Sequence, residues 1–181
     1  MPGPFVDAFN QTPDVFTGLG NGYTMRTVIL SGLLSNTGKK YCRVTFYAQD
    51  VTLGLTIDGA YIQTQGAGDA YDFSTTPVQL LFDGGSAGFA IAAGASKATD
   101  TATFTIPAGT NIVISCHTSA NSGIGGKSGL ATGSRLYFKA GASEAGTVDV
   151  TGYTASTDGT VWPIGRIEVA DDESGPWVTI F

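Results

Sequence analysis

The clearest pattern in this chain is an alternation of apolar and polar residues that begins near residue 24. A period of two places successive side chains on opposite faces of an extended strand, so it predicts half-buried β-strands. In the segment 41–48, one face would carry Cys42, Val44, Phe46 and Ala48, and the other Tyr41, Arg43, Thr45 and Tyr47. The segment 101–117 repeats the pattern, with a Pro-Ala-Gly corner at 107–109 between two strands.

Further segments are expected to be strands for the same reason: Thr24–Leu30, Leu53–Ile57, Val78–Phe82, Ser134–Lys139, Thr147–Val150, Arg166–Ala170 and Trp177–Phe181. Turn-forming residues separate the strands, at 35–38, 58–59, 83–85 and 158–159. The frame F-x-I-x-A-G at 89–94 and again at 104–109 predicts a strand end followed by a glycine corner. No window has a sustained helical period. The pattern therefore predicts an all-β, two-sheet antiparallel β-sandwich, similar to a jelly roll.

Residues 1–22 have a different character. Pro2, Pro4 and Pro13 interrupt helix and sheet ladders, yet the segment is too apolar for a free tail. We expect an extended N-terminal arm at 1–22, followed by the sandwich domain at 23–181. The arm must pack against its own domain or a neighbouring subunit, and Phe5, Phe9 and Phe16 are the candidate partner-binding residues. The long Gly/Ser/Ala/Thr stretches 119–133 and 139–146 are predicted to be exposed loops.

The composition and charge of the chain argue against two classes of partner. The chain has 181 residues, a formal net charge of −6 and only 9 Lys and Arg, of which Lys39-Lys40 is the one adjacent pair. Phosphate and anionic membrane surfaces require clustered positive charge, so neither nucleic acid nor membrane is expected as a partner. No apolar run approaches the ~18 residues of a spanning helix. Charged residues at 13% and hydrophobic residues at 42% indicate a folded chain.

The cysteines and the N-terminus bear on where the protein works. Cys42 and Cys116 lie in apolar-alternating segments, which favours two buried free thiols over a single disulfide. The N-terminus has no basic region followed by an apolar stretch, so we expect either use without export or a leader that has been removed. Assembly of a virion in the host cytoplasm agrees with the first case, and an extracellular module with the second.

The order of several pieces resembles a known family. These pieces are TMRTV at 24–28, RVTF at 43–46, LTIDGA at 55–60, 78–85 leading into FAIAAG at 89–94, and FTIPAGT at 104–110. Residues 24–117 resemble the non-catalytic β-sandwich that precedes the catalytic domain of some SGNH (GDSL-type) hydrolases. The compact Gly/Thr/Ala-rich pattern also resembles β-sandwich proteins of bacteriophage virions. The resemblance implies a fold and a binding role rather than an activity.

Catalytic strings of that hydrolase family are missing. Neither Gly-Asp-Ser nor Asp-x-x-His occurs, and His117 is the only histidine. Its neighbour Cys116 would point to the opposite face of the same strand, so the two cannot form a nucleophile–base pair. His117 is therefore expected to be a histidine at a strand end, and no catalytic residue is predicted.

Other candidate sites have two interpretations each. Asp69 with Asp72 and the run 171–173 are the acidic clusters in which a pair of glycosidase-type carboxylates would have to lie. For the run 171–173 a solvated turn is favoured over calcium binding, because no EF-hand spacing occurs; no metal or cofactor is predicted. Trp162 and Trp177 could stack on a sugar ring, although packing in a core or interface is the favoured interpretation.

These observations favour a non-catalytic structural protein of a bacteriophage particle, such as a decoration, head-fibre, collar or tail component. Its expected partners are other virion proteins or copies of itself in a homo-oligomer. The alternative is a carbohydrate-binding or accessory β-sandwich that recognises a cell-surface glycan. A hydrolase is the third interpretation.

Overall fold

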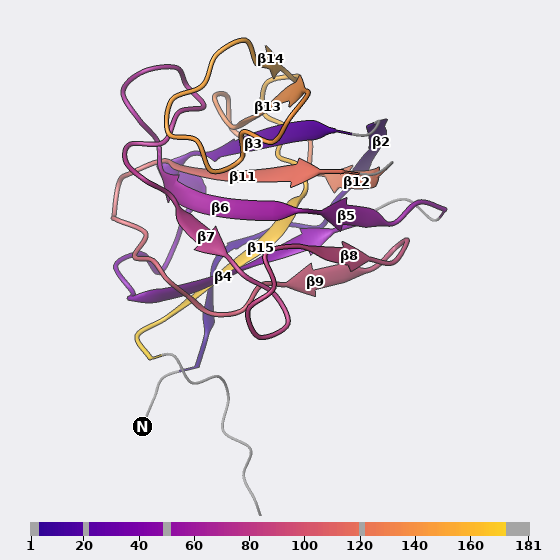
Figure 1. Cartoon of the computed structure of the whole chain (residues 1–181). Coiled ribbons are helices and arrows are strands. Elements are labelled where there is room, and N and C mark those ends of the chain that lie inside the picture. The colour runs from indigo at the N-terminus through magenta and orange to yellow at the C-terminus, as the bar shows by residue number, and fades with distance from the viewer. Residues whose placement is uncertain (1–3, 20–21, 49–51, 120–121, 173–181) are drawn as a thin grey trace, which may run out of the picture.

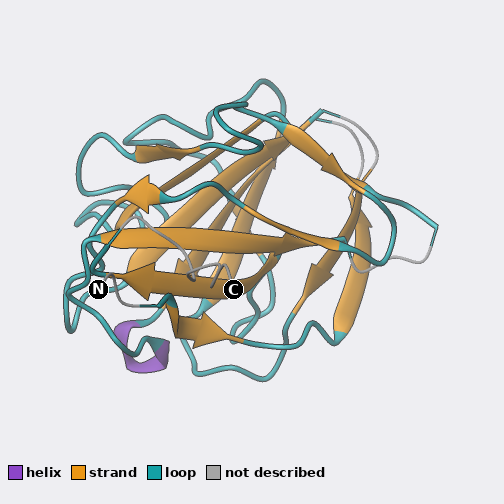
Figure 2. Ribbon diagram, turned by 90° about the horizontal axis from the view of Figure 1, so that it is seen from below, coloured by secondary structure: helices purple, strands orange, loops and turns teal. Residues whose placement is uncertain are grey.

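The computed structural model describes residues 4–19, 22–48, 52–119 and 122–172. Nearly every element is a strand, and the one helical turn in these ranges is η1 (Ser31–Leu33), which lies at the periphery (Figure 2). The strands form two principal antiparallel sheets that pack face to face (Figure 1). This arrangement confirms the all-β sandwich predicted from the alternation.

The first sheet has five strands in the order β1–β15–β4–β10, with β9 also paired to β4. Their bounds are β1 (Val6–Asn10), β15 (Ile164–Ala170), β4 (Tyr41–Tyr47), β10 (Ala102–Thr103) and β9 (Ser96–Ala98). Strand β4 alternates as expected: Cys42, Val44, Phe46 and Ala48 are buried, and the residues between them are half-buried. The outer face of this sheet carries the polar half of the alternation.

The second sheet has six strands in the order β14–β13–β3–β11–β6–β7. Their bounds are β14 (Thr154–Ala155), β13 (Arg135–Ala140), β3 (Tyr23–Ile29), β11 (Ile112–Thr118), β6 (Gly59–Thr64) and β7 (Val78–Leu80). Two small ladders complete the fold, β12 (Ser122–Gly126) with β2 (Val15–Leu19) and β5 (Leu55–Ile57) with β8 (Phe89–Ile91).

The main core lies between the two large sheets. Met25 and Ile29 of β3 and Ile114 of β11 meet Val44 of β4 and Ile167 of β15, and all are almost completely buried. Burial of one such side chain stabilises the fold by about 1.5–3 kcal/mol.

The outer face of the six-stranded sheet is also covered, because two segments fold over it. We call residues 65–77 and 141–153 the covering loops. Phe73 of the first packs on Val28 and Val113, and Val148 of the second joins the same small cluster. Strand β11 is consequently buried on both faces, although its sequence alternates like a half-buried strand.

Two predicted elements are wrong. Thr147–Val150 is not a strand: it belongs to the second covering loop, and its backbone binds the Arg26 side chain, Phe73 and Asp72 instead of a neighbouring strand. The stretch 119–133 is not loop throughout, because β12 forms within it, and the prediction missed this strand because glycines give no alternation. Trp177–Phe181 lies outside the described residues.

The glycine corners are confirmed. In both copies of F-x-I-x-A-G the glycine has a positive φ, +69° at Gly94 and +71° at Gly109. The same backbone bond closes each turn, from Ala95 N–H to Ala92 O at 3.1 Å and from Thr110 N–H to Pro107 O at 3.4 Å.

Candidate functional site

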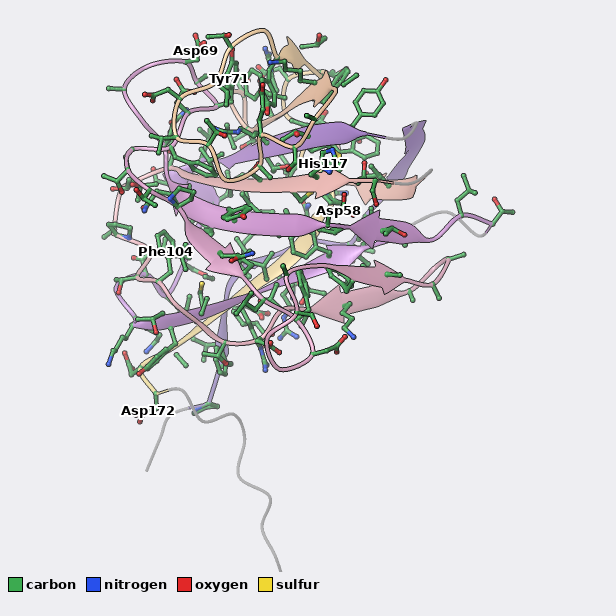
Figure 3. All side chains as sticks on the ribbon, in the orientation of Figure 1. Asp58, Asp69, Tyr71, Phe104, His117 and Asp172 are labelled. Carbon is green, nitrogen blue, oxygen red and sulfur yellow. The ribbon has the colours of Figure 1, made fainter. Side chains whose placement is uncertain are left out.

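The only histidine is held by a group that lies far away in the sequence. His117 points to the outer face of β11, away from buried Cys116, as the strand alternation requires. Its Nδ1 lies 2.8 Å from Asp58 Oδ2, and its Nε2 lies 3.3 Å from the carbonyl oxygen of Gly141. Ser119 Oγ donates to the other oxygen of Asp58 at 2.5 Å. Asp58 at the junction of β5 and β6 (Figure 3) thus contacts the end of β11 twice, and His117 connects this cluster to Gly141.

This cluster differs from a catalytic triad in its connections. In a triad the histidine lies between the hydroxyl and the carboxylate, so that it can take the hydroxyl proton. Here Asp58 lies between Ser119 and His117, and the second histidine nitrogen faces a carbonyl group. The arrangement fastens strand ends and a loop to one another. Sequence reasoning missed the Asp58 contact because Asp58-Gly59 reads only as a turn.

The aromatic residues of the N-terminal segment contact their own domain where they are described. Strand β1 pairs with β15, and Phe9 is 5% exposed within the main core. Phe5 is half-buried, and the Arg43 guanidinium lies 4.3 Å from the centre of its ring. The backbone at Phe16 is part of β2, but its side chain lies outside what the structure describes. Of the two expected arrangements, the described residues adopt packing on the same domain.

Trp162 packs in the core, as the favoured interpretation predicted, and the alternative of an exposed platform at Trp162 is not found. The Trp162 side chain belongs to the main core and is 8% exposed. Its ring lies so close to Gly126 that a Cβ there would come within 2.3 Å of a ring carbon. A sugar ring has no access to a face packed in this way. Trp177 lies outside the described residues.

Of the two acidic clusters, Asp69 and Asp72 bind groups of the covering loops, and Asp171 forms an ion pair with a lysine. Asp72 is buried, and its two carboxylate oxygens accept N–H groups of Asp69 at 2.8 Å and Val150 at 3.1 Å. Asp69 accepts the hydroxyl of Tyr71 at 2.8 Å. Asp171 pairs with Lys39 at 2.7 Å, and residue 173 lies outside the described part. Within the described ranges, no group of three or more His, Cys, Asp or Glu is placed to hold a metal ion.

Both cysteines are free and buried, which confirms the favoured interpretation. Burial raises the pKa of Cys42 and of Cys116 to about 12, so neither thiol forms a reactive thiolate at neutral pH.

The outer face of the five-stranded sheet carries a row of paired charges across three strands. Arg43 of β4 contacts Glu168 of β15 through two bonds of 2.7 and 3.0 Å. Arg166 contacts the same carboxylate at 3.3 Å and Asp7 of β1 at 2.5 Å. Tyr41 and Tyr47 flank this row on β4, and the Tyr47 ring lies directly against Gly165. We call Phe5, Tyr41, Arg43, Tyr47 and Arg166 the open face.

Buried Arg26 organises the opposite side of the molecule. It points outward from β3 under the covering loops and is 0% exposed. Its guanidinium donates to the carbonyls of Tyr71 at 2.9 Å, Glu144 at 3.1 Å and Val148 at 3.3 Å, and also to that of Thr147. Burial lowers the pKa of Arg26, and nearby Tyr153, Asp72 and Glu144 counter this effect. The sequence signal that could have indicated this contact is the position of Arg26 inside the predicted strand Thr24–Leu30.

Compared with known protein families and with curated proteins, the sequence matches none of them. Among the described elements, the longest helix is far too short to cross a membrane. Function must therefore be inferred from the surfaces themselves.

Proposed function

We propose that this protein is a non-catalytic structural component of a bacteriophage particle that acts through contacts with other proteins, including copies of itself. The observation that supports this proposal is the asymmetry of the sandwich. The outer face of the six-stranded sheet is covered by the protein's own loops, whereas the open face presents half-buried aromatic and arginine side chains.

The chemistry of the open face suits a protein partner. Tyr, Phe and Arg are enriched in protein interfaces because they combine a large contact area with hydrogen-bonding groups. The ion pairs among Arg43, Glu168, Arg166 and Asp7 already hold these side chains in place. Less side-chain entropy is then lost when a partner binds. The low-charge, Gly/Thr/Ala-rich composition and the resemblance to virion proteins favour a bacteriophage particle as the place where this interface is used.

The first test asks where the protein is found. Mass spectrometry of purified particles encoded by the same genome should detect the chain at a fixed copy number relative to the major capsid protein. Its absence from washed particles would contradict the proposal.

The second test asks which surface binds. Tyr41→Lys should weaken association with particle proteins, or self-association, by roughly tenfold or more, as for a residue in an interface centre. Asp149→Lys, an exposed position on a covering loop, is the matched control and should bind normally. Sedimentation velocity measures association, and circular dichroism verifies that both variants fold. Normal binding by Tyr41→Lys together with lost binding by Asp149→Lys would assign the interface to the opposite side.

A carbohydrate-binding role is the alternative, and the buried Trp162 would then not be its stacking residue. Because Trp162 is buried, a glycan that binds should leave the fluorescence of Trp162 unchanged. Titration of a Trp177→Phe variant, which retains Trp162 as its one tryptophan, measures this directly.

A further inference from the structure

Four charged side chains along the open face balance one another. They are Asp7 on β1, Arg166 and Glu168 on β15, and Arg43 on β4, and we call them the charge row. Two arginines and two carboxylates give the row a formal charge of zero, whereas the whole chain carries −6. Two copies of a chain with this net charge repel each other, so a neutral face is a favourable place for them to meet.

The two ends of the charge row have opposite sign. In the strand register Asp7 is the neighbour of Glu168, and Glu168 is the neighbour of Arg43. Neighbouring strands are about 4.8 Å apart, so the Cα atoms of Asp7 and Arg43 lie roughly 10 Å apart across the sheet. Strand β1 therefore presents the negative end and β4 the positive end. Strand β15, with one charge of each sign, lies between them.

A face with this order of charges is complementary to a copy of itself turned by half a revolution. A two-fold axis perpendicular to the sheet at β15 exchanges the positions above β1 and β4. It brings Asp7 of each copy to Arg43 of the other. Where the axis passes between Glu168 and Arg166, these two residues also face their opposites in the other copy. Isologous dimers have this reciprocal pattern, in which residue i contacts j and j contacts i.

The charge row also retains hydrogen-bonding groups at both ends. Arg43 and Arg166 each use Nε and Nη2 within the row, and neither Nη1 group has an acceptor among the described residues. The two carboxylate oxygens of Asp7 accept one bond each, from Arg166 and Asn10, although each oxygen has two lone pairs. A second copy in the turned orientation supplies acceptors to the arginines and donors to Asp7.

We propose that two copies of this chain form a two-fold symmetric dimer through the open face, in which Asp7 of each copy pairs with Arg43 of the other. This inference rests on the proposed function, because it names a partner for the same face. Phe5, Tyr41 and Tyr47 are half-buried in the single chain and add aromatic contact area around the charge row. A partner of uniform charge fits less well, since one end of the row would then meet a like charge.

Two charge reversals test the dimer, with sedimentation equilibrium of the full chain as the measurement. Asp7→Lys and Arg43→Glu each place like charges together at both contacts, so each alone should weaken dimerisation by roughly tenfold or more. An equimolar mixture of the two variants should dimerise as the native chain does. In the mixed dimer the introduced lysine meets the introduced glutamate at one contact, and native Arg43 meets native Asp7 at the other.

The controls separate the interface from the fold. Asp149→Lys changes the charge by the same amount as Asp7→Lys but lies exposed on a covering loop, so it should dimerise normally. Circular dichroism verifies folding, because Arg43→Glu places a carboxylate beside Glu168, whose side chain is 7% exposed. The milder double variant Asp7→Asn, Arg43→Gln removes the contacts without repulsion. It should weaken the dimer and remove most of its dependence on salt.

A native chain that sediments as a monomer at every concentration would overturn the proposal, as would reversals or a double variant that dimerise like the native chain. A mixture of the two reversals that stays monomeric would overturn the two-fold pairing. These results are distinguishable from failure of the proposed function. A monomeric chain found in washed particles contradicts only the dimer, and a dimeric chain absent from particles contradicts only the role in the particle.

Discussion

Glycines in this protein create space for aromatic rings as well as turns. A Cβ at Gly126 would lie 2.3 Å from the ring of Trp162, and one at Gly165 would lie 2.0 Å from the ring of Tyr47. Real Cβ atoms do not approach other atoms so closely, so these rings lie against backbone positions that only glycine permits. The high glycine content, 26 residues, is therefore explained in part by packing between strands.

Gly126→Ala should lower the free energy of unfolding by about 1–3 kcal/mol, the usual cost of overpacking a core. The added methyl group must displace the Trp162 ring, so the tryptophan emission should also shift. Gly32→Ala is the matched control, because no atom lies within 4 Å of its added Cβ and its backbone does not adopt a positive φ. Urea unfolding measures both variants. Equal stability of the two would show that the ring at 162 moves aside without cost.

At the scale of elements, β1 and the covering loops complete faces that the other strands leave open. Strand β1 places Ala8 and Phe9 in the main core, although its prolines and position suggested a separate arm. The covering loops join each other through Phe73 N–H to Val148 O at 3.1 Å and join the sheet through Arg26. The covering loops lack regular alternation, yet their backbone carbonyls bind buried Arg26 and their own Asp72 is buried.

Arg26→Met should lower the free energy of unfolding by about 3–5 kcal/mol, since it removes the donor to several buried carbonyls. Hydrogen exchange should accelerate in both covering loops, which the guanidinium holds together. Arg135→Met on neighbouring β13 is the control: its ion pair with Asp158, at 3.2 Å, is partly exposed and contributes about 1 kcal/mol or less. Exchange that increases in only one covering loop would contradict the joint role of Arg26.

At the scale of the whole molecule, ion pairs and capped turns link sheets and loops at its surface. Burial acts to raise the pKa of Asp7, but hydrogen bonds from Arg166 and Asn10 outweigh it and lower the pKa overall. A hydrogen bond from Lys127, assisted by Ser128, lowers the pKa of Asp14. The N–H of Gly133 and the Arg135 side chain lower the pKa of Asp158.

These lowered pKa values predict loss of stability in acid. A carboxylate whose folded pKa is below its unfolded pKa stabilises the fold above the unfolded value, about 3.9, and this contribution disappears as pH falls through the folded value. The urea midpoint should therefore decrease as the pH falls below about 4. The triple variant Asp7→Asn, Asp14→Asn, Asp158→Asn should have a lower midpoint at pH 7 and a smaller decrease between pH 7 and pH 3. Asp149→Asn is the exposed control, and an unchanged acid response in the triple variant would contradict the prediction.

The sequence by itself determined the features that depend on neighbouring residues. Alternation in 41–48 predicted both faces of β4 correctly, because a strand turns successive side chains to opposite sides whatever lies around it. The glycine corners at Gly94 and Gly109 were predictable for the same local reason, since a positive φ favours glycine. The opposite orientations of Cys116 and His117 also follow from strand geometry alone.

The tertiary structure decided which faces are covered and which distant groups meet. Alternation cannot tell a face open to solvent from one covered by loops, so the burial of Arg26 and His117 became visible only when the covering loops were placed. Asp58 contacts His117, which lies 59 positions later in the sequence. The Trp162 ring fits into the core because Gly126, on β12, has no side chain in its way. Such contacts depend on how the strands are ordered in the sheets, and that order is set by the packing of the whole chain.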